Sequence, residues 1–275
     1  MPDTAVGTSK SVSVALSEAT ARLTAAGCDT PRLDAELLLS YVLGAGRERL
    51  VIDAHAQLDV EALKRFTAVV ARREAREPVA YILGRKAFRR IAVSVDRRVL
   101  IPRPETELLV EVALSLGRGS RVADVGTGSG AVALALKEER PDLCVVGIDV
   151  SADALAVARL NAAALGLDVE FVQADLLDGV PGPFGAVLGN LPYVAEGSAL
   201  PPEIESYEPS LALFGGPDGM DPVRRLLPML AGVSLVALEV GLAEAVASLV
   251  ADAGFPSVEI LRDLADHERV VVGRR

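Results

Sequence analysis

The stretch Asn190-Leu191-Pro192-Tyr193 places a hydrogen-bonding side chain and a stiff backbone directly after the apolar run 186–189. Pro192 has a fixed φ and no N–H, and it holds Leu191 in an extended conformation, so the carbonyls before it are available to accept hydrogen bonds. The Asn190 side chain adds one acceptor and two donors at the same point. The pattern predicts a ligand-contacting segment at the end of a strand, or else an ordinary strand-to-loop turn.

A glycine-rich stretch, Gly126-Thr127-Gly128-Ser129-Gly130, is the second group of residues suited to holding a ligand. It follows Asp124, and the helical pattern after it predicts free backbone N–H groups that face a ligand. Asp149 comes about 20 residues after the glycines, where a carboxylate can accept both hydroxyls of a ribose. Such a turn alone serves dinucleotides, nucleotides and plain tight turns, but the G-x-G-x-G spacing differs from the G-x-G-x-x-G of dinucleotide sites.

The elements that must position these groups alternate between strands and helices from Arg121 onward. This alternation predicts an α/β fold, a Rossmann-like parallel sheet with helices on both faces. The expected strands are 121–125, 144–148, 169–172, 186–189, 235–240, 258–261 and 270–272. Asp149, Asp175 and Asn190 each follow one of these strands, so we expect all three at the carboxyl end of the sheet.

The first part of the chain predicts a bundle of short helices, because apolar residues recur there at spacings of three and four. Thr30 and Pro31 indicate an N-cap followed by proline at the first helical position, and Gly44 indicates the end of that helix. The residues expected on one face of this helix are Leu33, Leu37 and Tyr41.

Residues 78–106 have the pattern of a β-hairpin that joins two domains. Ile91, Val93 and Val95 alternate with shorter residues, and Asp96 offers a turn before the next apolar run. The expected organisation is a helical domain over 1–77, a hairpin linker over 78–106 and an α/β domain over 107–275.

The composition of the 275-residue chain, 51% hydrophobic and 24% charged, is typical of a soluble globular protein. No stretch reaches the roughly 18 uncharged apolar residues of a membrane span, and the N-terminus lacks the regions of a signal peptide. Two distant cysteines, Cys28 and Cys144, fit neither a disulfide framework nor a metal site, and only two histidines are present. We therefore expect a cytoplasmic protein without a metal, a membrane contact or histidine-based catalysis.

The net charge of −10 argues against a protein whose whole surface binds nucleic acid. One basic stretch runs against this balance, since residues 72–103 contain ten basic side chains and three acidic ones. The stretch predicts either a solvated helix face or a docking surface for a polyanion or an acidic partner.

The segment from Asp124 to Gly130 resembles motif I of the class I S-adenosylmethionine-dependent methyltransferases. The resemblance implies that S-adenosylmethionine is the cofactor and S-adenosylhomocysteine the product, with the glycines close to the methionine part. It assigns the ribose to Asp149 and the adenine amine to Asp175. Leu176, beside the adenine, and Asn190 complete the implied cofactor-binding residues. The alternative for Asp149 and Asp175 is a plain role as helix N-caps.

The stretch at 190–193 resembles the (Asn/Asp)-Pro-Pro-Tyr motif of methyltransferases that act on planar amino or amide nitrogens. An amide nitrogen is a poor nucleophile because its lone pair is delocalised. The resemblance implies that the Asn190 side-chain oxygen and the Leu191 carbonyl accept the two N–H groups and orient the nitrogen for in-line attack on the methyl group. Tyr193 would pack on the planar group, and no tuned general base is required.

Further segments narrow the resemblance to the PrmC/HemK family, the N5-glutamine methyltransferases of peptide chain release factors. These segments are Glu77–Gly84 with Phe88, Ile101–Glu107, Tyr207–Pro209 with Ala212–Phe214, and Glu268–Val270. The resemblance implies a substrate glutamine in the Gly-Gly-Gln loop of class 1 release factors and a helical domain that helps to dock this protein. It also implies that the basic stretch faces the acidic partner or the mouth of the active site.

Two residues depart from the family pattern, Leu191 in place of the first motif proline and Leu176 in place of a frequent aromatic residue. Asn-Leu-Pro-Tyr is also similar to the motif of adenine-N6 ribosomal RNA methyltransferases, so methylation of an adenine in RNA or DNA is one alternative. A non-catalytic adenosine-binding module is another. The acidic balance and the flanking segments favour the protein-glutamine methyltransferase, with no direct nucleic-acid contact expected.

Overall fold

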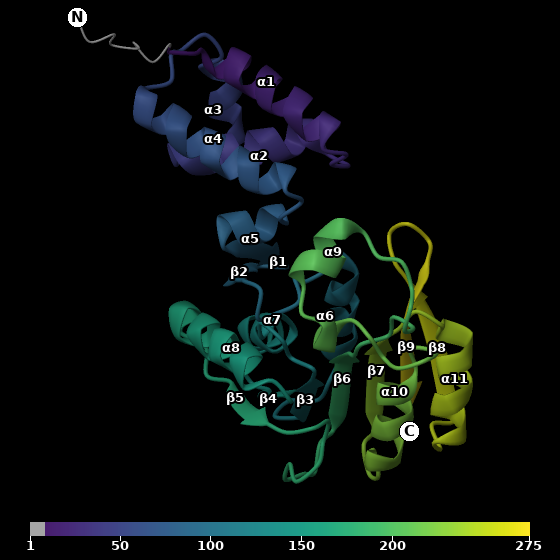
Figure 1. Ribbon diagram of the computed structural model, residues 1–275. Coiled ribbons are helices and arrows are strands. Elements are labelled where there is room, and N and C mark those ends of the chain that lie inside the picture. The colour runs from purple at the N-terminus through teal and green to yellow at the C-terminus, as the bar shows by residue number, and fades with distance from the viewer. Residues whose placement is uncertain (1–8) are drawn as a thin grey trace, which may run out of the picture. The chain divides into compact units, whose positions relative to one another are not determined.

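The computed structural model describes residues 9–275, which divide into two compact units (Figure 1). A helical unit comprises the residues up to Gly84 together with 201–207, and an α/β unit comprises 85–200 and 208–275. The domain boundaries expected after residues 77 and 106 stay predictions, since this division depends on packing rather than on sequence pattern. Among residues 9–275, none of the helices combines the length and the apolar character needed to cross a membrane.

The helical unit buries one apolar cluster between helices whose ends carry clear stop and start signals. Asp59 caps one helix by accepting the N–H of Ala62, and Gly44 ends another in the left-handed conformation. The helices are α1 (Val12–Ala25), α2 (Pro31–Leu43), α3 (Arg47–Ile52), α4 (Val60–Glu74), α5 (Val79–Leu83) and α9 (Pro202–Tyr207).

The face of α2 that carries Leu33, Leu37 and Tyr41 is not the buried one. Leu33 and Tyr41 are exposed and Leu37 is half-buried, whereas the buried residues include Leu38, Leu39 and Val42. Leucines occupy neighbouring stripes of this helix, so the packing partners rather than the periodicity select the buried stripe. Thr30 does precede the helix, but its hydroxyl donates to Asp34 Oδ1 and makes no capping hydrogen bond.

Buried charge ties α9 to the rest of the helical unit. Arg73, on α4, is 6% exposed and lies 2.8 Å from Asp34 Oδ2 and 3.0 Å from Glu203 Oε1. Arg76 pairs with the other oxygen of Glu203 at 2.7 Å. The Tyr207 hydroxyl donates to the Ala75 carbonyl at 2.7 Å. The segment 202–207, which lies in the sequence between two strands of the sheet, is therefore held by the N-terminal helices.

The hairpin is present in the α/β unit, but its expected turn is wrong. Strand β1 (Arg85–Phe88) pairs antiparallel with β2 (Ile91–Ser94), so the turn lies at Arg89 and Arg90 rather than at Asp96. Arg89 adopts a φ of 47°, and its guanidinium binds Glu139 while its N–H donates to Glu107. These contacts with later elements hold a turn that its own sequence does not signal.

A seven-stranded sheet forms the α/β unit, as the sequence pattern predicts. Its order is β5-β4-β3-β6-β7-β9-β8, and β9 runs antiparallel to both of its neighbours while the other pairs are parallel. The strands are β3 (Arg121–Val125), β4 (Cys144–Asp149), β5 (Glu170–Gln173), β6 (Ala186–Asn190), β7 (Leu235–Glu239), β8 (Ser257–Arg262) and β9 (Glu268–Arg274). The order reverses direction between β3 and β6, which is where open α/β sheets bind ligands.

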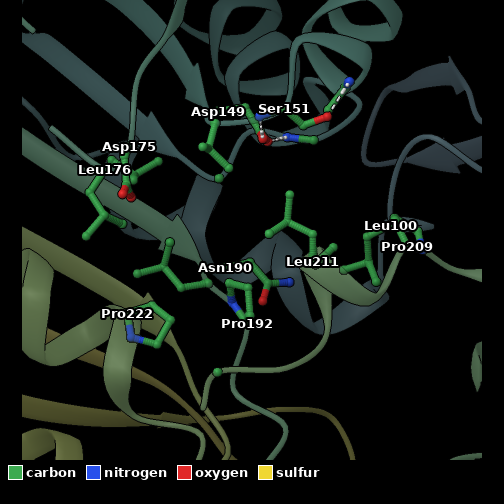
Figure 2. A pocket seen from close by; sticks show the side chains of 18 of the residues that line it. Leu100, Asp149, Ser151, Asp175, Leu176, Asn190, Pro192, Pro209, Leu211 and Pro222 are labelled. Atoms are coloured by element: carbon green, nitrogen blue, oxygen red, sulfur yellow. Dashed lines mark hydrogen bonds between the residues drawn. The ribbon is translucent and has the colours of Figure 1, made fainter. Parts of the chain in front are cut away.

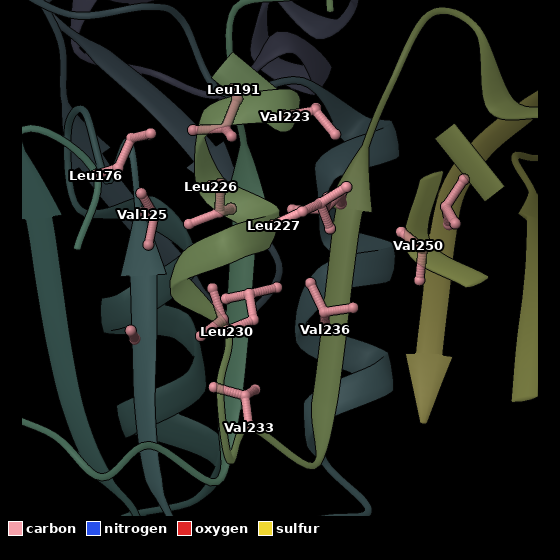
Figure 3. Packing of buried hydrophobic residues seen from close by; sticks show 14 of the residues in the cluster. Val125, Leu176, Leu191, Val223, Leu226, Leu227, Leu230, Val233, Val236 and Val250 are labelled. Carbon is pink, nitrogen blue, oxygen red and sulfur yellow. The ribbon is translucent and has the colours of Figure 1, made fainter. Parts of the chain in front are cut away.

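Helices cover both faces of this sheet. The helical segments are η1 (Pro104–Thr106), α6 (Glu107–Ala113), α7 (Ala131–Glu139), α8 (Ala152–Leu165), η2 (Ser210–Ala212), α10 (Asp221–Leu226), η3 (Leu227–Met229) and α11 (Ala243–Asp252). In Figure 3, Leu226 and Leu230 pack against Val125 and Val236, so α10 and η3 bury one face of the strands. Leu191 and Leu176 lie at the upper end of the same apolar cluster.

Most side chains of the basic stretch pair with carboxylates. Seven of its ten basic residues bind carboxylates within their own unit: Arg72, Arg73 and Arg76 in the helical unit, and Arg89, Arg90, Arg98 and Arg103 in the α/β unit. The charge excess seen in the sequence is therefore largely balanced by internal pairs.

Candidate active site

A cavity of about 330 Å³ lies at the carboxyl ends of the parallel strands, where the strand order reverses. Its size falls within the range of small-molecule sites, about 300–1,000 Å³. Figure 2 shows Asp149 and Ser151 at the top of it, Asp175 and Leu176 on the left, and Asn190 and Pro192 below them. The sequence-predicted residues that line the cavity are Gly126, Gly128, Asp149, Asp175, Leu176, Asn190, Leu191 and Pro192.

The first three N–H groups of the glycine loop are bonded within the protein, whereas the sequence predicts free groups. The N–H groups of Gly126 and Thr127 both donate to the Ile148 carbonyl, and that of Gly128 donates to Asp149 Oδ2 at 2.9 Å. The loop is thus bonded back onto the end of β4. Gly126 and Gly128 have φ values of 73° and 55°, which favour glycine. Because these two glycines have no side chains, they leave room for a ligand at the cavity wall.

Four residues of the predicted cofactor set, Asp124, Thr127, Ser129 and Gly130, are buried and do not line the cavity. Asp124 is 2% exposed, and its Oδ2 accepts the Thr127 hydroxyl at 2.6 Å and the N–H of Ala133 at 3.1 Å. Burial raises the pKa of Asp124 to about 6. The carboxylate joins the glycine loop to the first turn of α7, so its visible role is to shape the loop.

Asp149 has carboxylate oxygens that are only partly engaged by the protein. Oδ2 accepts the N–H of Gly128 and Oδ1 accepts the N–H of Ser151, each at 2.9 Å. Burial raises the pKa of Asp149. Two oxygens that accept one N–H each retain further lone pairs for a ligand. Helix α8 is capped instead by the Ser151 hydroxyl, which excludes the N-cap role for Asp149.

Asp175 and Leu176 form a second part of the cavity wall. The Asp175 carboxylate pairs with Arg225 of α10, and both side chains are more than half exposed. Asp175 begins no helix, so the N-cap alternative is excluded here too. Leu176 is buried with a φ of 55°, a left-handed conformation that costs a non-glycine residue about 1–2 kcal/mol. Such backbone strain concentrates at functional sites.

Asn190 is the last residue of β6, and its side-chain amide is held by residues that the sequence reasoning did not select. Its Nδ2 donates to Thr106 Oγ1 at 3.1 Å. Thr106 Oγ1 in turn donates to Glu239 Oε2 at 2.6 Å. Glu239 lies opposite Asn190 in the β6–β7 pairing. The available signal was a glutamate at the end of an otherwise apolar strand.

The remaining motif residues differ in where they lie. Leu191 is 4% exposed and belongs to the main apolar cluster, and its Cδ2 would be 3.4 Å from a Cβ added at Gly126. Pro192 lines the cavity, but Tyr193 does not. The Tyr193 ring lies against Gly241, where an added Cβ would be 3.2 Å from Cδ2. The contact expected between Tyr193 and a planar substrate group stays a prediction.

Apolar residues from two other segments also line the cavity, Leu100 from an earlier one and Pro209 and Leu211 from a later one (Figure 2). Phe214, of the later segment, lines it as well. Glu208 fixes this segment, since its buried carboxylate accepts the N–H of Ile101 at 3.1 Å and binds Arg103. Glu208, Pro209 and Phe214 carry part of the family resemblance, but they were not expected in the site.

The chain is similar to known proteins over most of its length. Residues 14–84 match the family described as the PrmC N-terminal domain, and residues 104–204 match the methyltransferase small domain. The chain is 41% identical over 266 residues to a release factor glutamine methyltransferase of Rhodospirillum rubrum, which covers 92% of this chain and 82% of that protein. It is 40% identical over 271 residues to one of Deinococcus radiodurans, covering 94% and 97%.

A solved structure, the hMettl16 catalytic domain in complex with MAT2A 3'UTR hairpin 1, has a TM-score of 0.56 and 14% identity. It covers 75% of this chain and 80% of that one. At this identity the likeness concerns the fold alone.

Proposed function

The chain belongs to the release factor glutamine methyltransferase family, and from that membership we propose that its cavity binds S-adenosylmethionine beside Asn190. The enzyme transfers a methyl group to the side-chain amide nitrogen of a release-factor glutamine, and we assign this to the Gly-Gly-Gln loop of class 1 factors. The single observation that carries the site assignment is the Asn190 amide. Its Nδ2 is committed to Thr106 Oγ1, so Oδ1 remains to accept a hydrogen bond from the substrate.

The residues of the cavity fit the proposed cofactor. Asp149 has spare acceptor sites for the ribose hydroxyls, Gly126 and Gly128 leave room at the wall, and Leu176 offers an apolar surface to the adenine. Asp175 would accept the adenine amine in place of Arg225. When bound, S-adenosylmethionine supplies an electrophilic methyl group on a sulfonium, and S-adenosylhomocysteine is left after transfer.

Asn190 and Leu191 orient the substrate amide in this proposal. Asn190 Oδ1 and the Leu191 carbonyl accept the two N–H groups of the glutamine side chain, which aims the nitrogen lone pair at the methyl group. The same two acceptors stabilise the positive charge that develops on nitrogen. The proton leaves after transfer, because a quaternised amide nitrogen is strongly acidic. Leu191 keeps the backbone acceptor that a proline would supply, and its buried side chain anchors the loop.

The proposed protein partner is the release factor, with the helical unit helping to dock it. The net charge of −10 favours a protein substrate over direct nucleic-acid binding. Incubation with radiolabelled S-adenosylmethionine would test both statements, using release factor, its glutamine-to-alanine loop variant and ribosomal RNA as separate acceptors. We expect label in the unaltered release factor alone. Label in RNA alone would establish the adenine-N6 alternative, and tight cofactor binding without label would establish a non-catalytic module.

A further inference from the structure

A buried chain of two hydrogen bonds ends at the Asn190 amide. Glu239 Oε2 accepts the Thr106 hydroxyl at 2.6 Å, and Thr106 Oγ1 accepts Asn190 Nδ2 at 3.1 Å. Thr106 is 5% exposed and Glu239 is 2% exposed. Glu239 is the last residue of strand β7 and lies beside the last residue of β6. Burial of a carboxylate is unfavourable because the group loses its hydration, and strand pairing does not need a carboxylate at this position. Glu239 is therefore expected to have a specific role.

The direction of the two hydrogen bonds follows from the donors available. A hydroxyl has one hydrogen, and an ionised carboxylate can only accept. When Glu239 is ionised, Thr106 must therefore give its hydrogen to Glu239 and must accept from its other neighbour. Of the two ends of the Asn190 amide only Nδ2 can donate, so this end turns to Thr106 and Oδ1 turns away from it.

We propose that Thr106 and Glu239 are positioning residues for methyl transfer, which fix the Asn190 amide so that Oδ1 rather than Nδ2 meets the substrate nitrogen. The inference rests on the proposed function of Asn190. A flipped amide would turn the donor Nδ2 toward the substrate N–H that Oδ1 should accept, so this contact could not form and only the one to the Leu191 carbonyl would remain. The two residues act through Asn190 and touch no substrate themselves.

The ionisation of Glu239 sets the direction of this chain. Burial raises the pKa of Glu239 to about 7, and Glu105 adds to the rise, while the Thr106 hydroxyl, Arg269 and Arg103 oppose it. Tyr193 also lies within electrostatic reach of this carboxyl. A protonated Glu239 can donate to Thr106, which then can donate to the Asn190 oxygen and hold the amide flipped. Turnover should therefore fall as the pH drops below about 7.

Three substitutions test the proposal under saturating release factor and S-adenosylmethionine. Thr106→Val keeps the shape and removes the hydroxyl, so kcat should fall about 10- to 100-fold, with the cofactor Kd and the release-factor KM within about threefold. Thr106→Ser keeps the hydroxyl and should restore kcat to within about threefold. Thr20→Val is the matched control, because Thr20 Oγ1 donates to the Leu16 carbonyl in the helical unit. Wild-type kcat in Thr106→Val, or a Thr106→Ser variant as slow as Thr106→Val, would overturn the proposal.

Glu239→Gln separates positioning from a purely structural effect. The kcat of the unaltered enzyme should be about tenfold lower at pH 6 than on its alkaline plateau, and Glu239→Gln should lack this acid limb. An acid limb that persists in Glu239→Gln overturns the proposal.

The Asn190 side-chain amide signal in 15N–1H NMR gives a readout that needs no turnover. The signal should shift with a midpoint near pH 7 in the unaltered enzyme and stay still in Glu239→Gln. If the unaltered enzyme methylates no release factor, the proposed function fails, and this titration still decides on the hydrogen-bond chain.

Discussion

Replacement of Arg73 by methionine is expected to destabilise the helical unit far more than the same change at its neighbour Arg72. Arg73 is 6% exposed, and its guanidinium lies 2.8 Å from Asp34 Oδ2 and 3.0 Å from Glu203 Oε1. Methionine fills a similar volume but leaves the Asp34 carboxylate, 6% exposed, without its counter-ion. Glu203 keeps its second cation, Arg76.

The magnitude follows from burial. At an effective dielectric constant of about 20, opposite charges about 3 Å apart attract by roughly 5–6 kcal/mol, and much of that attraction offsets the cost of removing both charges from water. Removal of one partner leaves the cost without the attraction, so we expect a loss of about 3–5 kcal/mol in the free energy of unfolding. The Arg72–Glu77 pair is half exposed on the arginine side, so Arg72→Met should cost about 0–1 kcal/mol.

Urea unfolding followed by tyrosine fluorescence measures this difference. The chain has no tryptophan, and three of its four tyrosines, Tyr41, Tyr81 and Tyr207, belong to the helical unit. The double variant Arg73→Met with Asp34→Leu removes both charges and should recover most of the loss. Equal losses for Arg73→Met and Arg72→Met, or no recovery in the double variant, would refute the buried-charge argument.

Three further outcomes are expected. Asn190→Ala should leave cofactor affinity within about threefold in calorimetry and lower turnover by about 10²-fold or more, since an orienting acceptor is lost; unchanged turnover would contradict the amide assignment. Asp149→Asn should weaken cofactor binding about 10- to 100-fold, because hydrogen bonds to a charged group contribute about 1.5–3 kcal/mol. Asp175→Asn should weaken cofactor binding less than Asp149→Asn does, because the Asp175 side chain is exposed. A larger loss of affinity in Asp175→Asn would contradict these roles. The free energy of unfolding should rise by about 3–4 kcal/mol between about pH 8 and about pH 5, because burial raises the pKa of Asp124 to about 6 and of Glu239 to about 7. As the pH falls, the folded state takes up protons at a higher pH than the unfolded chain does, so the free energy of unfolding increases. Urea unfolding at several pH values in this window measures the trend, and a flat or opposite one would contradict the prediction.

The sheet was predictable because its strands are local patterns. Each parallel strand is a short apolar run bounded by turn residues, and each is found within a residue or two of its expected place. The hairpin turn was misplaced because Arg89 takes a left-handed conformation that contacts with later helices hold. The attachment of α9 to the helical unit was not foreseen, since Glu203 and Arg73 are 130 positions apart in the sequence.

Only residues that line the cavity were predictable from the sequence, and the residues behind them were not. Asn190, Asp149 and Asp175 were found because each follows a strand end, and all three line one cavity. Thr106 was overlooked as a site residue because its meaning comes from a partner 133 positions away, Glu239. Asp124 was assigned to the cofactor because its position matches a motif, but its hydrogen bonds join it to the protein.

Because α9 belongs to the helical unit, the chain crosses between the two units more than once. The polypeptide passes between them after residue 84, after residue 200 and again after residue 207, so three connections join them rather than one. A protease that cuts only at the first connection should not release the N-terminal helices, because Arg73, Arg76 and the Ala75 carbonyl still hold Glu203 and Tyr207. The two halves of such a nicked chain should copurify, and separately expressed fragments divided at this point should reassemble into one enzyme.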